Sequence, residues 1–118
     1  MTDIINITVA LISIGLGGFG WLIPGYTMRA LDLTANGSTM GISEIRASAG
    51  ALFVGLGVGA LILADPVAYA VMGFAWGGAA LGRFTSILLD GAPSRQKIAF
   101  FAIEAVVAAL LLWLNIGR

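Results

Sequence analysis

Three ionisable side chains stand inside apolar stretches of this sequence: Glu44, Arg83 and Glu104. A charged group in lipid is costly, at ~2.5 kcal/mol or more near a bilayer centre, and it is tolerated when a partner neutralises it. We therefore expect Arg83 to pair with Glu104, with Glu44 or with both. The alternative is that Arg83 extends to the headgroups, while aromatic residues anchor the other end of its helix.

Three kinds of function fit such a cluster. The first is structural, a buried polar lock that fixes the register of a helix bundle, and it is the one we favour. The second is the binding or transport of a proton or of a small amphipathic or lipid-like ligand at Glu44, Arg83 and Glu104. The third is enzymatic, with Glu104 as a general base. We expect no enzyme, because no nucleophile, metal set or phosphate loop accompanies the acid.

The composition indicates that lipid is the solvent. Of 118 residues, 59% are hydrophobic and only 10% are charged, against about 25% charged in soluble domains. The chain has no Cys and no His, which argues against zinc sites, His-ligated haem and disulfides, so we expect no metal and no cofactor. The net charge is zero and there is no basic run, so no nucleic acid partner is expected.

Hydrophobic runs and their punctuation predict a single all-α domain, 1–118. Four antiparallel transmembrane helices are expected at about 4–23, 42–64, 66–90 and 94–116, with a short interfacial segment between the first two. The third begins at Asp65-Pro66, a cap followed by a proline, and ends at Asp90-Gly91 before Pro93. Its 25 residues make roughly 37 Å of helix, enough to cross a bilayer core of about 30 Å.

Heptad spacing places the third helix's Arg83 on one stripe with Tyr69, Trp76 and Asp90. Glu104 lies about 15 Å along the fourth helix, near the bilayer middle, so it must be paired or protonated. On the second helix, Glu44 falls on the face of the small residues, whereas Arg46 lies about 200° around.

Small residues recur at every fourth position of the second and third helices, which is typical of closely packed membrane helices. The glycines that we expect at helix–helix contacts are Gly55, Gly59, Gly73, Gly77, Gly78 and Gly82.

Basic residues gather on one side when the four spans are threaded. The residues at or nearest that face are Arg29, Arg46, Arg83, Arg95 and Lys97, whereas the other face has only Arg118. The positive-inside rule puts the first face in the cytoplasm. We expect a multi-pass protein of the bacterial inner membrane with both termini in the periplasm. Its expected partners are the lipid bilayer, further copies of itself or a larger membrane complex, and a lipid or other hydrophobic ligand.

Two motifs carry a resemblance. One opens the second helix as Ser43-Glu44-Ile45-Arg46-Ala47-x-x-Gly50, with Gly55-Leu-Gly57 after it, and the other is Leu81-Gly82-Arg83-x-x-Ser86-x-x-x-Asp90-Gly91-x-Pro93. With Glu104, these resemble an uncharacterised family of small bacterial four-helix membrane proteins, over about residues 15–112. The resemblance implies a four-helix bundle marked by Glu44, Arg46, Arg83, Asp90 and Glu104, and it implies no reaction. The fold is also similar, more distantly, to DoxX-like membrane proteins, which implies an accessory role beside a larger membrane complex.

Overall fold

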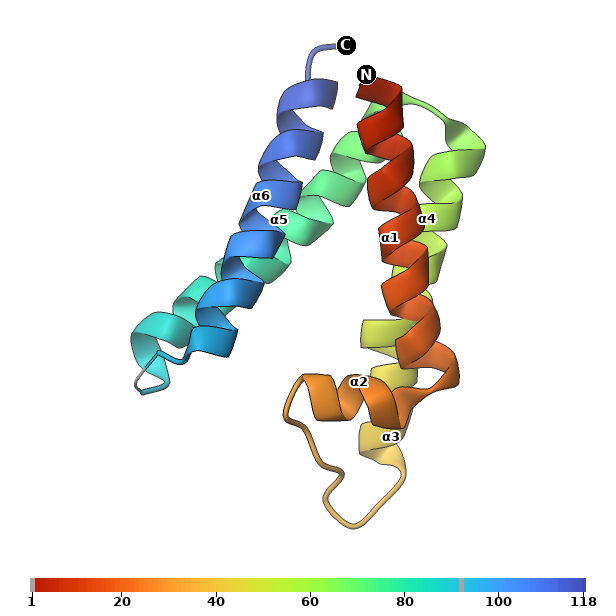
Figure 1. Ribbon diagram of the computed structural model, residues 1–118. Helices are drawn as coiled ribbons and strands as arrows, with labels where there is room; N and C mark the ends of the chain where they lie inside the picture. Colours follow the sequence, from red (N-terminus) through yellow and green to blue (C-terminus); the bar gives the residue numbers. More distant parts are fainter. Residues whose placement is uncertain (1, 92) are drawn as a thin grey trace. The chain divides into compact units, whose positions relative to one another are not determined.

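The structure, a computed structural model, describes residues 2–91 and 93–118, and these form helices without a strand (Figure 1). In chain order the elements are α1 (Thr2–Leu22), α2 (Pro24–Ala30), α3 (Met40–Arg46), a π-helical turn (Ala47–Ala51), α4 (Leu52–Leu63), α5 (Pro66–Leu89) and α6 (Arg95–Asn115). The α3 helix, the π-helical turn and α4 run on as one helical segment, Met40–Leu63. The predicted helix bounds lie within two residues of the observed ones.

Local sequence explains where these helices begin. The side chain of Asp65 accepts a hydrogen bond from the backbone N–H of Val67, and Pro66 occupies the first turn of α5. Ser94 caps α6 in the same way, by accepting from the N–H of Lys97. The segment between the first two long helices contains the short helix α2, and the following loop contains Gly37 at a φ of 80°, a conformation that suits glycine.

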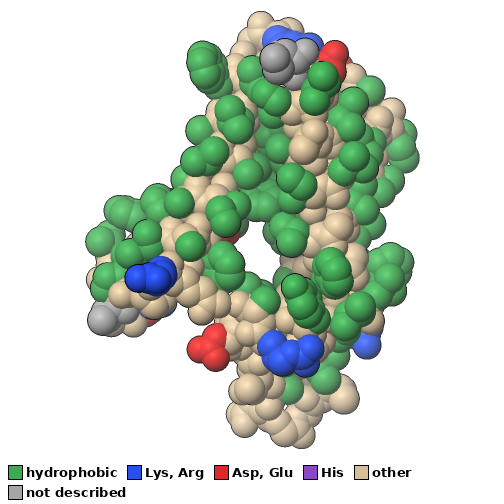
Figure 2. All heavy atoms as spheres, in the orientation of Figure 1, with side chains coloured by type: hydrophobic (Ala, Val, Ile, Leu, Met, Phe, Trp, Pro, Cys, Tyr) green, Lys and Arg blue, Asp and Glu red, His purple; other side chains and the backbone are tan. Residues whose placement is uncertain are grey.

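Three of the described helical segments are long and apolar enough to cross a membrane: Thr2–Leu22, Met40–Leu63 and Arg95–Asn115. Large apolar side chains remain exposed along them, and Figure 2 shows hydrophobic side chains over much of the visible face. The α5 helix is 24 residues long but is not one of these three, since glycines, Arg83, Thr85 and Ser86 lower its hydropathy. The molecule is thus all-helical, with three helices of the kind found in membranes.

The helices fall into two compact units, residues 7–62 and residues 1–6 with 63–118. In the first unit α1 packs against the π-helical turn and α4 through glycines. A Cβ on Gly50 would lie 2.6 Å from the backbone nitrogen of Trp21, and one on Gly57 would lie 2.6 Å from the carbonyl oxygen of Ala10. These glycines therefore allow a backbone-to-backbone approach that no side chain would fit.

Within this unit, α1 packs against a face of the second span other than the predicted one, and the contacts predicted for Gly55 and Gly59 stay predictions. Gly55 and Gly59 have no atom within 4 Å of a would-be Cβ among the described residues of the unit, whereas Gly57 is in close contact. Residues two positions apart lie about 200° around a helix, so Gly57 cannot share a face with its two neighbouring glycines. The stripe of small residues is real, but α1 packs on the other side of the helix.

In the second unit, α5 and α6 form an antiparallel hairpin, seen side by side in Figure 1. Gly73 lies against Leu111, since its would-be Cβ would be 2.9 Å from the Cβ of that residue, and Gly77 faces Ala108 at 3.5 Å. These two predicted contacts are confirmed. Gly78 and Gly82 have open space within the described part of the unit, because Gly73 and Gly77 form the side of α5 that faces α6. The contacts predicted for Gly78 and Gly82 stay predictions.

Candidate functional site

An ion pair joins the two helices of the α5–α6 hairpin. The Nε of Arg83 donates to Oε1 of Glu104 at 2.9 Å, and its Nη2 donates to Oε2 at 3.4 Å. The pair forms because an antiparallel hairpin brings residue 83, near the end of α5, beside residue 104, in the first half of α6. The predicted pairing of Arg83 with Glu104 is confirmed.

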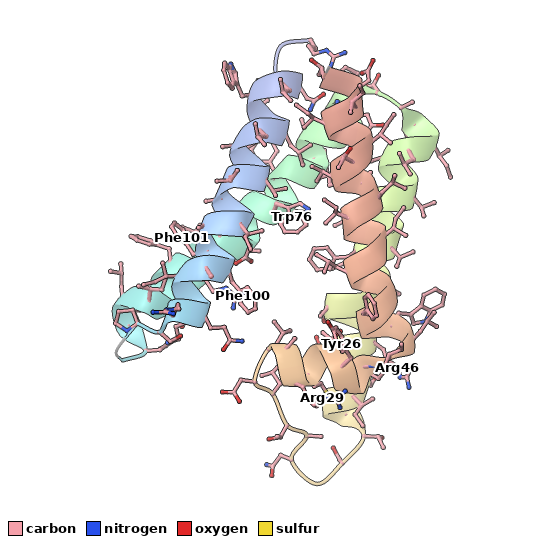
Figure 3. The ribbon with its side chains drawn as sticks, viewed as in Figure 1. Tyr26, Arg29, Arg46, Trp76, Phe100 and Phe101 are labelled. Atoms are coloured by element: carbon pink, nitrogen blue, oxygen red, sulfur yellow. The ribbon has the colours of Figure 1, made fainter. Side chains whose placement is uncertain are left out.

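The two members of the pair are buried to different extents. The side chain of Glu104 is 10% exposed and that of Arg83 is 33% exposed. The guanidinium carbon of Arg83 also lies 5.3 Å from the centre of the Phe100 ring, a cation–π distance. Figure 3 shows Phe100 and Phe101 pointing to different sides of α6, and Phe101 instead contacts Phe84, with 5.5 Å between ring centres. Glu104 is therefore the buried member of the pair, and Arg83 is the more exposed one.

The predicted stripe on α5 runs from buried to exposed. Tyr69 and Trp76 are each 6% exposed, Arg83 is half-buried, and Asp90 is exposed at the end of the helix. Among the described residues Asp90 forms no ion pair. Along this stripe the side chains thus change from buried aromatic residues to an exposed acid, and Arg83 lies where burial gives way to exposure.

Glu44 and Arg46, which the sequence grouped with Arg83, belong to the other unit. Glu44 is exposed and accepts a short hydrogen bond from the hydroxyl of Ser48, one turn along the chain. Arg46 donates from Nη1 to the carbonyl oxygen of Trp21, at the end of α1, at 2.6 Å. Within one unit, the structure brings Arg83 and Glu104 together, and the pairing of Glu44 with Arg83 stays a prediction.

A second polar contact, which the sequence analysis missed, lies at the opposite end of the hairpin. Asn6 and Asn115 are 1% and 3% exposed, and each side-chain amide donates to the other's oxygen at 2.8 Å. Beside them Arg118 lies 3.7 Å from a carboxylate oxygen of Asp3. The signal was present as a single Asn near the outer end of each of two apolar helices, but an isolated Asn has no spacing rule that identifies its partner.

Chemically, the pair of Arg83 and Glu104 can neutralise charge inside the hairpin and can present a guanidinium at its surface. No group of three or more acidic, His or Cys residues that could hold a metal ion occurs in the part of the chain that the structure describes. The fold and site together define a small all-helical protein with membrane-type helices and an internal ion pair.

The chain belongs to the family described as Domain of unknown function (DUF4345), which matches residues 1–115. This confirms the resemblance to an uncharacterised family. The searches of curated proteins and of solved structures found no match.

Proposed function

We propose that this protein is a multi-pass membrane protein with four spanning helices that serves as an accessory, structural or assembly subunit of a larger membrane complex. The observation that carries the proposal is the Arg83–Glu104 ion pair, which joins α5 to α6 and neutralises both charges. A carboxylate that accepts two hydrogen bonds from an arginine is engaged as a structural partner. Such a pair stabilises one arrangement of two helices whose apolar contacts discriminate little.

The Asn6–Asn115 contact supports the count of four spans. It joins the start of α1 to the end of α6, so the two ends of the chain belong to the same side of a membrane. A chain whose ends meet crosses a bilayer an even number of times. The three apolar segments therefore call for a fourth crossing, and α5, at about 36 Å, is long enough to provide it.

The distribution of charges supports a proposed orientation and compartment. Five basic residues lie at or nearest one face of the four-span arrangement, which we assign to the cytoplasm of a bacterial cell, with both termini in the periplasm. The accessory role is also what the resemblance to DoxX-like proteins, expected from the sequence, would imply. In this role the exposed apolar side chains of the spans face lipid, further copies of the chain or larger subunits.

Gentle extraction from the native membrane, followed by native gel separation and mass spectrometry, tests the accessory role. We expect the wild-type protein to migrate with the same larger membrane subunits, in a fixed ratio, in repeated preparations. The double variant Arg83→Leu/Glu104→Leu removes both charges of the lock and should weaken this association, whereas Arg118→Leu, a cation at the other end of the hairpin, should not. Migration of the wild type alone would contradict the accessory role.

A second candidate function is ligand binding at the same cluster. It is favoured by one observation, the one-third exposure of the Arg83 side chain, because a purely internal lock has no need of a cation at the surface. In the extraction experiment, a bound lipid or pigment in place of fixed subunits supports this second function.

A further inference from the structure

The guanidinium of Arg83 uses only part of its hydrogen-bonding capacity in the pair with Glu104. An arginine has five N–H donors. Nε and Nη2 each give one to Glu104, and Nη1 donates to none of the described residues of its own unit. Within this unit, the edge formed by Nη1 and the outer N–H of Nη2 is therefore open. Such an edge binds the two oxygens of a carboxylate or phosphate through parallel hydrogen bonds.

The surroundings of Arg83 direct a ligand to that edge. The Phe100 ring lies over the guanidinium at 5.3 Å, so it covers one face and leaves approach in the plane of the group. The apolar residue Phe84, next to Arg83 in the chain, is 44% exposed. A ligand that places an anionic group on Arg83 therefore meets apolar surface beside it, as an amphipathic molecule requires.

The charge balance of this end of the hairpin calls for one anion. Residues 83–104 contain three cations, Arg83, Arg95 and Lys97, and two acids, Asp90 and Glu104, which leaves one positive charge. Lys97 is half-buried and Arg95 is exposed in the first turn of α6, and neither forms an ion pair within the described residues. A phosphodiester carries a single negative charge and would neutralise the excess.

The position of Arg83 along α5 suits a membrane lipid. Six residues follow it before the helix ends at Leu89, so its Cα lies about 9 Å from that end. A long arginine side chain extends several ångströms toward the headgroups from such a depth. The phosphate of a phospholipid lies within that reach.

We propose that the open edge of Arg83 binds the phosphate of an anionic phospholipid while the opposite edge holds Glu104. This deepens the proposed function and relies on it for the placement of α5 in the bilayer. The lipid then neutralises the excess positive charge at this end of the hairpin, and the ion pair serves both as a lock between helices and as the base of a lipid site.

Native mass spectrometry of delipidated protein in detergent micelles tests the site. The probes are phosphatidylglycerol, a diacylglycerol with the same acyl chains, oleate and inorganic phosphate. We expect phosphatidylglycerol to bind at least tenfold more tightly than diacylglycerol, as a charge-assisted contact of about 1.4 kcal/mol or more requires. Inorganic phosphate, which has no apolar part, should bind weakly and should not displace the lipid. Oleate should bind less tightly than phosphatidylglycerol, because it has one acyl chain in place of two.

Two matched variants isolate the open edge. Arg83→Lys keeps a positive charge opposite Glu104 but has no second edge, so phosphatidylglycerol affinity should fall about tenfold. The same replacement at Arg118, also a partly exposed cation paired with a carboxylate, should leave the affinity unchanged. If Arg83→Lys does not fold, the neutral variant Arg83→Leu/Glu104→Leu replaces it, with the same expected loss.

Four results overturn the inference: equal affinity in the wild type and both Arg83 variants, equal affinity for diacylglycerol, displacement of the lipid by inorganic phosphate, or tighter binding of oleate. The two experiments together separate this inference from the proposed function. If the wild-type protein shows no lipid selectivity but still migrates with larger subunits, only the lipid site is contradicted. Selective lipid binding without any co-migrating subunit removes only the accessory role.

Discussion

In the Arg83–Glu104 pair, the carboxylate of Glu104 is buried, whereas the arginine side chain is partly exposed. Removing Arg83 therefore leaves a buried charge with no partner, and removing Glu104 leaves a cation in apolar surroundings. A broken buried pair typically costs ~3–5 kcal/mol, and the partial exposure of Arg83 favours the lower end of that range.

A double-mutant cycle on this pair gives a sharp expectation. Arg83→Leu and Glu104→Leu should each destabilise the protein by about 3 kcal/mol, and the double variant should be milder than their sum. Unfolding in mixed micelles, followed by circular dichroism, measures the three free energies of unfolding. Simple addition of the two losses would mean that the pair is not coupled. The exposed pair of Arg118 and Asp3 is the control, where Arg118→Leu should cost no more than ~1 kcal/mol.

The two buried amides behave differently, because they are polar but uncharged. Asn6→Leu leaves the Asn115 amide without its partner and should cost about 1–3 kcal/mol, whereas Asn6→Leu/Asn115→Leu should recover part of that loss. The same unfolding assay applies. A double variant that is less stable than either single variant would show that the site needs polar groups for another reason.

At the scale of the element, sequence reasoning located the helices well and their contact faces only in part. Caps such as Asp65 and Ser94 act within one turn of the chain, so their effect is readable locally. The face of a helix that receives a neighbour depends on the neighbour as well. Within their unit, Gly17 and Gly50 pack closely while Gly55 and Gly59 meet open space, although all four are glycines in small-residue patterns.

The ion pair was predictable for a related reason, since two opposite charges in apolar helices have few ways to be satisfied. The Asn6–Asn115 contact was not, because an amide can also bond to its own helix, as Asn115 does with the carbonyl oxygen of Leu111 at 2.8 Å. The π-helical turn could not be predicted from the sequence, since Ala, Ser and Gly also occur in ordinary α-helical turns of membrane proteins.

Two glycines two residues apart on α4 test the contact face. Gly57→Ala places a Cβ 2.6 Å from the carbonyl oxygen of Ala10 and should destabilise the protein by about 1–3 kcal/mol. Gly55→Ala meets open space within its unit and should be neutral or stabilising by up to ~1 kcal/mol, because Ala favours helix over Gly. Thermal unfolding in detergent compares them. Equal losses at both positions would show that Gly55 also lies at a contact.

At the scale of the whole molecule, the number of crossings decides the topology. A chain with four spans has both ends on one side, and a chain with three has them on opposite sides. Because the sequence contains no Cys, single cysteines report each side without background.

Labelling with a membrane-impermeant thiol reagent in intact cells tests both the count and the orientation. We expect Thr2→Cys and Gly117→Cys to be labelled, since both termini face outward, and Ser38→Cys in the loop after α2 to be protected. Labelling of only one terminus would contradict the four-span arrangement, and labelling of Ser38→Cys alone would mean that the orientation is inverted. Permeabilised cells, in which all three variants react, provide the control.

The π-helical turn at Ala47–Ala51 has a consequence at the level of the gene. It accommodates one residue more than an α-helical turn would, so loss of a single codon there would leave a continuous α-helix. The residues before the turn would keep nearly their present rotation relative to α4, because the wider turn absorbs the extra residue. Arg46 would therefore stay near the carbonyl of Trp21, and the contact of Gly57 on α4 would stay in place. The turn thus marks a position where this segment can gain or lose one residue while its charged end keeps its direction.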